Sequence, residues 1–139
     1  MRTTSDRVRH AISFEFIGLL LVTPLGAWVF HQPLHDIGVV AVVGATVAMV
    51  WNYVFNLGFD HALVRLTGRL DKSLALRVLH AALFELGLLL LLLPFVMVYL
   101  GVGPLEALVM DLGFALFYMV YAFVFNLAYD RVFPVPGLN

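Results

Sequence analysis

The chain contains the same sequence twice, with the second copy 70 residues after the first. Residues 7–66 align with residues 77–136 without a gap, and 19 of the 60 aligned positions are identical. Chance similarity between apolar helices would repeat leucine and valine, whereas here polar residues also recur. The repeated polar pairs are Arg7/Arg77, His10/His80, Glu15/Glu85, Asn56/Asn126 and Asp60/Asp130. Two copies of one unit therefore bring charged and amide groups to equivalent places.

The composition places these units in a membrane. The chain is 63% hydrophobic and 12% charged, whereas soluble domains are roughly 45–50% apolar and 25% charged. Four apolar stretches cover about 11–30, 37–59, 79–100 and 105–129, and each has the ~20 residues that a helix needs to cross a bilayer. We therefore expect an all-α, integral membrane four-helix bundle made of two parallel two-helix repeats. The first repeat would be 1–70, with helices at about 7–30 and 35–64, and the second 71–139, with helices at about 73–100 and 104–130.

The basic residues indicate the orientation of the helices. All eight Lys and Arg lie before or at the start of the first helix, around the middle connection, or after the fourth helix, and the other two connections have none. The positive-inside rule then puts both termini and the middle loop in the cytoplasm. This predicts a multi-pass membrane protein with both termini in the cytoplasm. The chain has no cysteine, which excludes disulfides, thiolate metal sites and thiol catalysis.

The repeated polar residues are expected at similar depths in the inner half of the membrane. Glu15 lies about 12 Å above Arg7 at 1.5 Å per helical residue, and Asn56 on the descending helix should lie near the depth of Glu15. Asp60 should lie near that of Arg7, at the lipid headgroups. The second repeat places Glu85, Asn126, Asp130 and Arg77 in the same way. We expect Arg7, Asp60, Arg77 and Asp130 to fix helix ends through ion pairs or lipid, as structural or gating residues.

The acidic residues are the main candidates for proton coupling. A carboxylate within a bilayer is costly and is by default a functional hypothesis, so Glu15 and Glu85 could each hold a proton and exchange it for a cation. Permanent pairing with a neighbouring His, Arg or amide is the structural alternative. Asp111 has no repeat counterpart and is a candidate outer relay or a satisfied polar residue. His10 and His80 could handle protons or form structural hydrogen bonds.

Aromatic residues form stripes beside the amides. Asn52, Asn56 and Asp60 recur every four residues, and Trp51, Phe55 and Phe59 form the neighbouring stripe. Ring faces attract cations and carboxylates neutralise them, so the expected substrate is an organic cation with an apolar body. An interfacial aromatic belt is the alternative. The candidate substrate-binding residues are Glu15, Trp51, Asn52, Phe55, Asn56, Tyr121, Phe125 and Asn126.

A stripe of small residues favours close helix contact. Gly38, Ala41, Ala45 and Ala48 follow one face of the second helix and suit either a dimer interface or a seat for the first helix. Four helices enclose little volume, while a site for a drug-sized cation commonly needs ~300 Å³. We therefore expect a homodimer in membrane lipid, with no nucleic-acid partner.

These residues carry a resemblance to a known family. The chain resembles the proteobacterial antimicrobial compound efflux (PACE) transporters, which are built from two tandem bacterial transmembrane pair domains. Their signatures are R-x-x-H-x-x-x-F-E in the first and third helices, W-N-x-x-[FY]-N-x-x-F-D in the second and Y-x-x-x-F-N-x-x-Y-D in the fourth. The matching residues are Arg7, His10, Phe14, Glu15; Trp51, Asn52, Phe55, Asn56, Phe59, Asp60; Arg77, His80, Phe84, Glu85; and Tyr121, Phe125, Asn126, Tyr129, Asp130.

The resemblance implies a secondary transporter rather than an enzyme. It implies proton-coupled export of cationic biocides, such as chlorhexidine and acridine dyes, with diamines as a further substrate class. It also implies that Glu15 handles the proton and that the proton gradient, with no cofactor or metal, drives transport. Two other classes remain open from the residues alone: a haem or metal protein using His10 and His80, and a structural membrane protein without transport.

Overall fold

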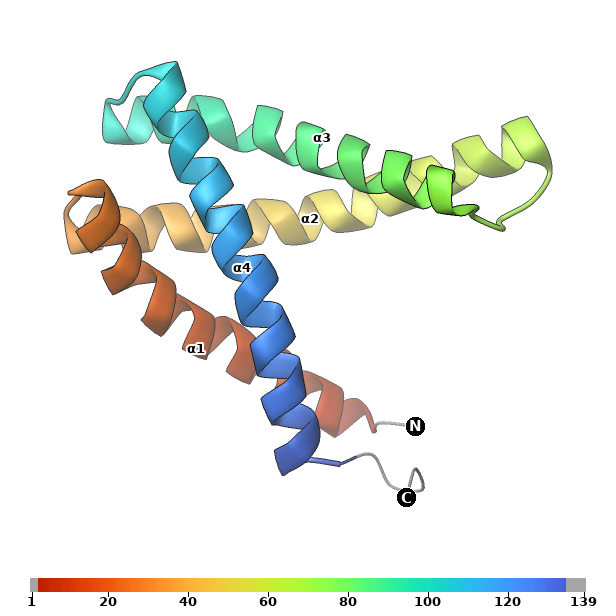
Figure 1. The fold of residues 1–139 in the computed structure, drawn as a ribbon, viewed down its shortest axis with the longest axis horizontal. Coiled ribbons are helices and arrows are strands. Elements are labelled where there is room, and N and C mark those ends of the chain that lie inside the picture. Colours follow the sequence, from red (N-terminus) through yellow and green to blue (C-terminus); the bar gives the residue numbers. More distant parts are fainter. Residues whose placement is uncertain (1–2, 135–139) are drawn as a thin grey trace. The chain divides into compact units, whose positions relative to one another are not determined.

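The computed structural model describes residues 3–134 and shows four long helices there (Figure 1). The helices are α1 (Thr4–Phe30), α2 (Leu34–Thr67), α3 (Leu74–Leu100) and α4 (Pro104–Val132). All four are long and apolar enough to cross a membrane. The prediction of an all-helical membrane protein is confirmed.

The repeat is visible in how the helices begin and end. The side chain of Thr3 accepts a hydrogen bond from the amide of Asp6 at the start of α1, and that of Ser73 accepts one from Leu76 at the start of α3. Such N-caps satisfy amides that have no partner within the helix. The same two helices end at a left-handed residue, His31 with φ 52° and Gly101 with φ 65°. Equivalent positions, 70 apart, therefore set the same helix bounds.

Contacts within the chain group the helices differently from the sequence repeats. One compact unit contains residues 1–41 and 112–139, and the other contains residues 42–111. The first unit pairs α1 with the larger part of α4, and the second pairs α3 with the larger part of α2 (Figure 1). Each unit thus contains one helix from the first repeat and one from the second.

Small residues allow close packing in the first unit. A Cβ atom on Gly26 would lie 3.0 Å from Ile37, and one on Gly113 would lie 3.0 Å from the ring of Phe30. One on Gly38 would lie 3.5 Å from Thr23 of α1. The outer end of the small-residue stripe therefore seats α1, which is one of its two predicted roles. The buried apolar residues of this unit are Val22, Ile37, Val40, Ala41, Tyr121 and Tyr129.

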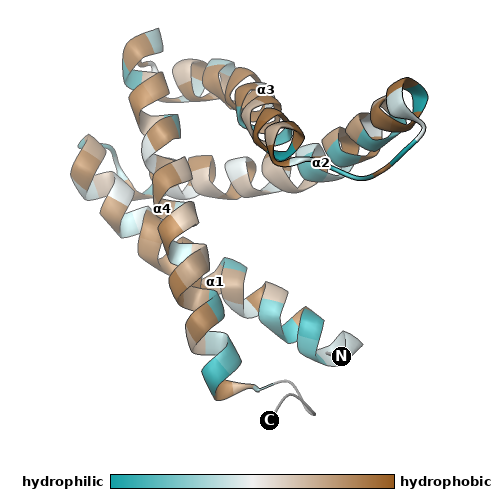
Figure 2. Ribbon diagram, turned by 45° about the vertical axis from the view of Figure 1, so that its right-hand side comes forward, coloured by the Kyte–Doolittle hydropathy of each residue, from teal (hydrophilic) through white to brown (hydrophobic). Residues whose placement is uncertain are grey.

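The second unit has a smaller buried core, formed by Leu63, Val96, Ala107 and Met110. Its tightest approach is at Gly87 of α3, where a Cβ atom would overlap the indole ring of Trp51. Many large apolar side chains of both units are exposed, such as Trp28, Val98 and Phe123. Hydrophilic residues gather instead near the start of α1, the end of α4 and the α2–α3 connection (Figure 2). This distribution is that of helices solvated by lipid along most of their length.

Candidate functional site

The contact between α1 and α4, here called the α1–α4 seam, is built from the first and fourth signatures. His10 Nε2 lies 2.8 Å from Asn126 Oδ1, so this ring nitrogen carries the hydrogen and donates it to the amide oxygen. The imidazole also meets the rings of Phe125 and Tyr129 edge-on, with centroids 5.3 and 4.7 Å away. The repeated histidine of α1 thus packs into the aromatic stripe of α4.

One turn deeper, Tyr121 fixes the same seam. Its hydroxyl donates to the carbonyl oxygen of Phe14 at 2.8 Å, and the two rings are 4.9 Å apart. The Tyr121 side chain lies over Gly18, where an added Cβ atom would be 3.0 Å from the ring. Because only 9% of its surface is exposed, Tyr121 acts here as a helix–helix contact.

The α2–α3 seam repeats this arrangement with the second and third signatures. His80 Nε2 lies 2.8 Å from Asn56 Oδ1, and the imidazole meets Phe55 and Phe59 edge-on at 5.0 and 4.6 Å. The amide nitrogen of Asn56 donates to the side chain of Asn52 at 2.9 Å and to its carbonyl at 2.7 Å. The two asparagines and the histidine thus form one hydrogen-bonded chain.

Trp51 occupies in the second seam the position that Tyr121 occupies in the first. Its indole N–H donates to the carbonyl of Phe84 at 3.0 Å, and its ring lies against Gly87. The polar atoms of Trp51 and Tyr121 therefore form hydrogen bonds within the seams. Phe55 and Phe125 are half-buried, and each packs against four neighbouring rings.

Each repeated glutamate follows a phenylalanine that packs into a seam. Glu15 and Glu85 are exposed, although the residues before them, Phe14 and Phe84, face the seam. Glu15 interacts electrostatically with Tyr118 and Tyr121 of α4. The repeat counterparts of these tyrosines are Ala48 and Trp51, so the neighbours of Glu85 lack both phenols. The two carboxylates are equivalent in sequence and different in surroundings.

Asp111 lies in the outer part of α4 and is half-buried. Its Oδ2 atom is buried and has no hydrogen-bond partner among the described residues. An unsatisfied buried oxygen is costly unless it binds a proton or another ligand. The arrangement is compatible with the predicted relay, which stays a prediction.

The charged residues at the helix ends have individual partners. The Asp60 carboxylate contacts the ammonium of Lys72 at 2.8 Å. Arg77 Nε donates to the backbone carbonyl of Lys72 at 3.2 Å, which ties the loop to the start of α3. Arg7 and Asp130 are exposed near the start of α1 and the end of α4. All of these residues lie close to helix ends, where structural roles were expected.

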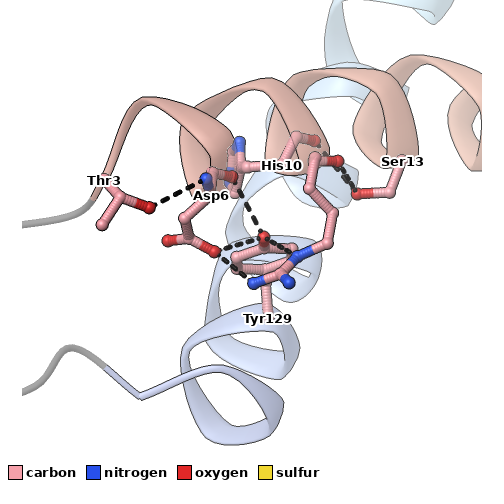
Figure 3. A network of polar contacts seen from close by, with 6 residues as sticks. Thr3, Asp6, His10, Ser13 and Tyr129 are labelled. Carbon is pink, nitrogen blue, oxygen red and sulfur yellow. Dashed lines mark hydrogen bonds and ion pairs between the residues drawn. The ribbon is translucent and has the colours of Figure 1, made fainter.

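A polar cluster at the start of α1 was not predicted as a site (Figure 3). Tyr129 donates its hydroxyl hydrogen to Asp6, with the oxygen 2.9 Å from Oδ1 and 3.2 Å from the carbonyl, and accepts a hydrogen bond from Arg9 Nε at 3.0 Å. Arg9 also pairs with Asp6 and lies over the ring of Phe133, 3.9 Å from its centroid. The cluster does not show in the alignment of the two repeats, because the residues equivalent to Asp6 and Arg9 are Leu76 and Leu79. The sequence signal for this cluster was the spacing of Asp6 and Arg9, which are three residues apart and therefore lie on one face of a helix.

Metal binding finds no support in the side chains that the structure describes. Within residues 3–134 no group of three or more His, Cys, Asp or Glu is placed to hold a metal ion. Both seam histidines direct Nε2 to an asparagine oxygen. Each histidine thus forms a hydrogen bond between two helices, which is one of its two predicted roles.

Comparison with known proteins identifies the family of this chain and several relatives. The family model for the chlorhexidine efflux transporters, BTP, matches residues 2–65 and again residues 72–135. A short-chain diamines transporter of Vibrio parahaemolyticus is 35% identical over 132 residues, which cover 95% of this chain and 93% of that protein. Short-chain diamines transporters of Acinetobacter baylyi and Acinetobacter baumannii are each 31% identical over 132 residues, covering 95% of this chain and 92% and 90% of theirs. No solved structure matches the chain.

Both repeats are thus recovered separately by one family model, and the relatives align over nearly the full chain with four membrane-spanning helices. The chain belongs to the chlorhexidine efflux transporter family, the PACE family of membrane efflux transporters.

Proposed function

We propose that this transporter exchanges protons for organic cations, exporting cationic amphipathic biocides, such as chlorhexidine and acridine dyes, and short-chain diamines. The family supports efflux, and the names of the three relatives support diamines as substrates. Transport would be driven by the proton gradient, without a cofactor or metal.

The observation that carries the coupling is the position of Glu15. It lies within a membrane-spanning helix, is exposed, and interacts electrostatically with two tyrosines of α4. A bare carboxylate in that environment is stabilised either by a proton or by a cation, and binding both together adds little. Proton and substrate would therefore alternate at Glu15, with Glu85 and Asp111 assisting proton movement.

The aromatic rings would hold the apolar body of the substrate. Phe55 and Phe125 lie next to the seam histidines and are half-buried. Ring faces attract a cation without strict directionality, which suits substrates of varied shape. Asn52, Asn56 and Asn126 would support these rings through the histidine hydrogen bonds.

The distribution of Lys and Arg supports an inner-membrane orientation with both termini in the cytoplasm. Since the chain has no cysteine, single cysteines report topology cleanly. A Gly103→Cys variant should be labelled by an impermeant maleimide only from the periplasm, and a Leu70→Cys variant only from the cytoplasm. Labelling with the opposite sidedness would refute this orientation.

Exposure of the glutamates supports a homodimer in membrane lipid. Glu15 and Glu85 are both uncovered by their own chain, and a carboxylate facing hydrocarbon is unfavourable. A second copy would cover this costly surface and enlarge a site that four helices alone can barely enclose.

Dye efflux from vesicles with an imposed pH gradient tests the proposed function. Wild-type protein should export an acridine dye when the gradient is present and stop when an ionophore collapses it. We expect Glu15→Gln to abolish gradient-driven export, because the amide can neither release a proton nor neutralise a cation. Glu106→Gln, which removes an exposed acid from the first turn of α4, is the matched control and should transport normally. Export by Glu15→Gln at the wild-type rate would leave Glu15 a structural residue.

A further inference from the structure

The α2–α3 connection carries the only lysine of the chain, Lys72. Its ammonium nitrogen lies 2.8 Å from Asp60 Oδ1 and 5.2 Å from the centroid of the Phe59 ring. A carboxylate and an aromatic face directed at one ammonium group form a recognised arrangement for binding organic ammonium ions. In this structure a side chain of the protein itself occupies that arrangement.

The ammonium lies beside a hollow large enough for another molecule. The hollow has a volume of about 350 Å³ and is lined by Asp60, Leu70, Asp71, Lys72 and Arg77. Small ligands bind in clefts of ~300 Å³ and above. Two of the five lining residues are acids, two are bases and Leu70 is apolar. When Lys72 leaves, two acids remain against Arg77, whose Nε is bonded to the Lys72 carbonyl, and the lining then suits a small cation with an alkyl chain.

The ion pair that fills the site can be exchanged. The Asp60 side chain is 43% exposed and that of Lys72 is 23% exposed, and ion pairs with such access to water contribute little stability. Asp60 Oδ1, although buried, accepts no hydrogen bond of good geometry from the described residues. Breaking this ionic contact therefore costs little when another ammonium replaces Lys72.

The backbone at Lys72 is fixed by hydrogen bonds of its neighbours, whereas its long side chain can change conformation. Arg77 Nε donates to the Lys72 carbonyl at 3.2 Å, and the next residue, Ser73, caps α3 through Leu76. A lysine ammonium is a point charge on a flexible four-carbon stem. The side chain can thus leave Asp60 without any rearrangement of the loop.

The corresponding end of the other unit is built differently. There Arg9 stacks on Phe133 and hydrogen-bonds Tyr129 and Asp6 at once. A guanidinium held by several directed hydrogen bonds is a rigid clamp. The contrast indicates that the lysine site exchanges its cation, whereas the arginine cluster fastens α1 to α4.

We propose that Asp60 and Phe59 form a binding site for the primary ammonium end of an alkylamine or diamine, and that Lys72 is a tethered occupant which the incoming ammonium displaces. The substrate class rests on the proposed function, but occupation of the site does not require transport or Glu15. Displacement makes Lys72 a selectivity element, because a ligand must offer an ammonium group that competes with a lysine.

The single lysine gives a direct test. Reductive ¹³C-methylation keeps the positive charge of Lys72 and yields one side-chain NMR signal, distinct from that of the terminal amine. The ring current of Phe59 should shift this signal in the free protein. Titration with 1,4-diaminobutane should move it saturably to the position of an exposed lysine, and 1-butanol, which has the same chain without charge, should leave it in place.

Variants separate this site from the rest of the protein. Asp60→Asn should start with the signal already near the exposed position, and Asp130→Asn, its repeat equivalent, should titrate like wild type. Calorimetry on Lys72→Gln should show tighter diamine binding, by about tenfold if Lys72 fills the site nine-tenths of the time. Weaker or unchanged binding by Lys72→Gln would overturn the proposal.

Calorimetry also separates failure of this site from failure of the proposed function. Binding of diamine to wild type and to Glu15→Gln with an unmoved Lys72 signal would refute the Asp60 site and leave cation transport standing. Absence of any diamine binding would refute this site together with diamines as a substrate class. A signal that moves equally in Asp130→Asn and Asp60→Asn would also refute the assignment to Asp60.

Discussion

At the scale of single residues, Gly87 shows how closely α2 and α3 approach. An added Cβ atom there would overlap the Trp51 ring, which cannot turn away freely because its N–H is bonded to Phe84. We expect Gly87→Ala to lower the free energy of unfolding by about 1–3 kcal/mol through overpacking. Gly58→Ala is the matched control in α2, where nothing lies within 4 Å, and it should be neutral or stabilising by up to about 1 kcal/mol. Equal melting of the two variants in detergent would contradict the close approach.

The two repeated glutamates should differ in function for a reason that is visible at the same scale. Glu15 interacts with Tyr118 and Tyr121, and Ala48 and Trp51 stand at the equivalent positions near Glu85. The two phenols near Glu15 have no counterpart at Glu85, so the two carboxylates have different electrostatic surroundings, and we expect them to differ in proton exchange. In the vesicle assay we expect Glu85→Gln to reduce dye export and Glu15→Gln to abolish it. A larger loss for Glu85→Gln would reverse this ranking.

At the scale of helices, the sequence predicted where the helices begin and end, but not the pairing of α1 with α4 and of α2 with α3. From the pattern of apolar and polar residues and the length of a membrane-spanning helix, the sequence predicted a helix at 104–130. The ends of this range lie within two residues of the ends of α4, Pro104–Val132. Lipid solvates apolar side chains as well as a neighbouring helix does, so the apolar pattern does not identify the packed face. The matching depths predicted for Glu15, Asn56, Glu85 and Asn126 were therefore consistent with several pairings. The contacts of Lys72 could not be predicted either, because a basic residue in a loop is interpreted as a marker of the orientation of the helices in the membrane.

The strength of the contact between a helix of the first repeat and a helix of the second can be measured as a coupling free energy. His10 and Asn126 are hydrogen-bonded across the α1–α4 seam, so replacing each by alanine, singly and together, should give non-additive losses. We expect a coupling of about 0.6–1.7 kcal/mol, the range found for polar contacts between membrane helices, in SDS titrations of the purified protein. The cycle between His80 and Asn56 should give a similar value, since the geometry is the same.

A distant pair controls for general destabilisation. Phe30 lies on α1 about 30 Å from His10 at 1.5 Å per residue, and its replacement should add to that of His10 within about 0.5 kcal/mol. Additivity for His10 and Asn126 as well would show that this seam is absent in the native protein.

At the scale of the whole molecule, the duplicated sequence and the contact units divide the chain in different ways. Residues 1–41 combine with 112–139, and 42–111 form the other unit, so each seam takes one helix from each repeat. A mutation at one signature consequently acts on the helix that carries the complementary signature of the other repeat. The chain can therefore keep both signatures of a repeat unchanged and still lose a seam through its partner repeat.

Assembly of two such chains is testable at Gly44, which lies beside the small-residue stripe of α2. No residue in the described range 3–134 lies within 4 Å of a Cβ atom at this position, so a larger side chain should leave the protomer intact. If a second copy packs here, Gly44→Leu should prevent the close helix contact that small residues allow and weaken dimerisation about tenfold or more. Gly58→Leu, at another open position on the same helix, should dimerise like wild type.

Light scattering and native mass spectrometry across a concentration series would measure the dissociation constants, and circular dichroism would confirm unchanged helix content. An unchanged dimer in Gly44→Leu would move the interface to another face, and a wild-type monomer that still exports dye would refute the dimer. Because Glu15 and Glu85 are uncovered in the single chain, loss of the dimer in Gly44→Leu should also abolish gradient-driven export.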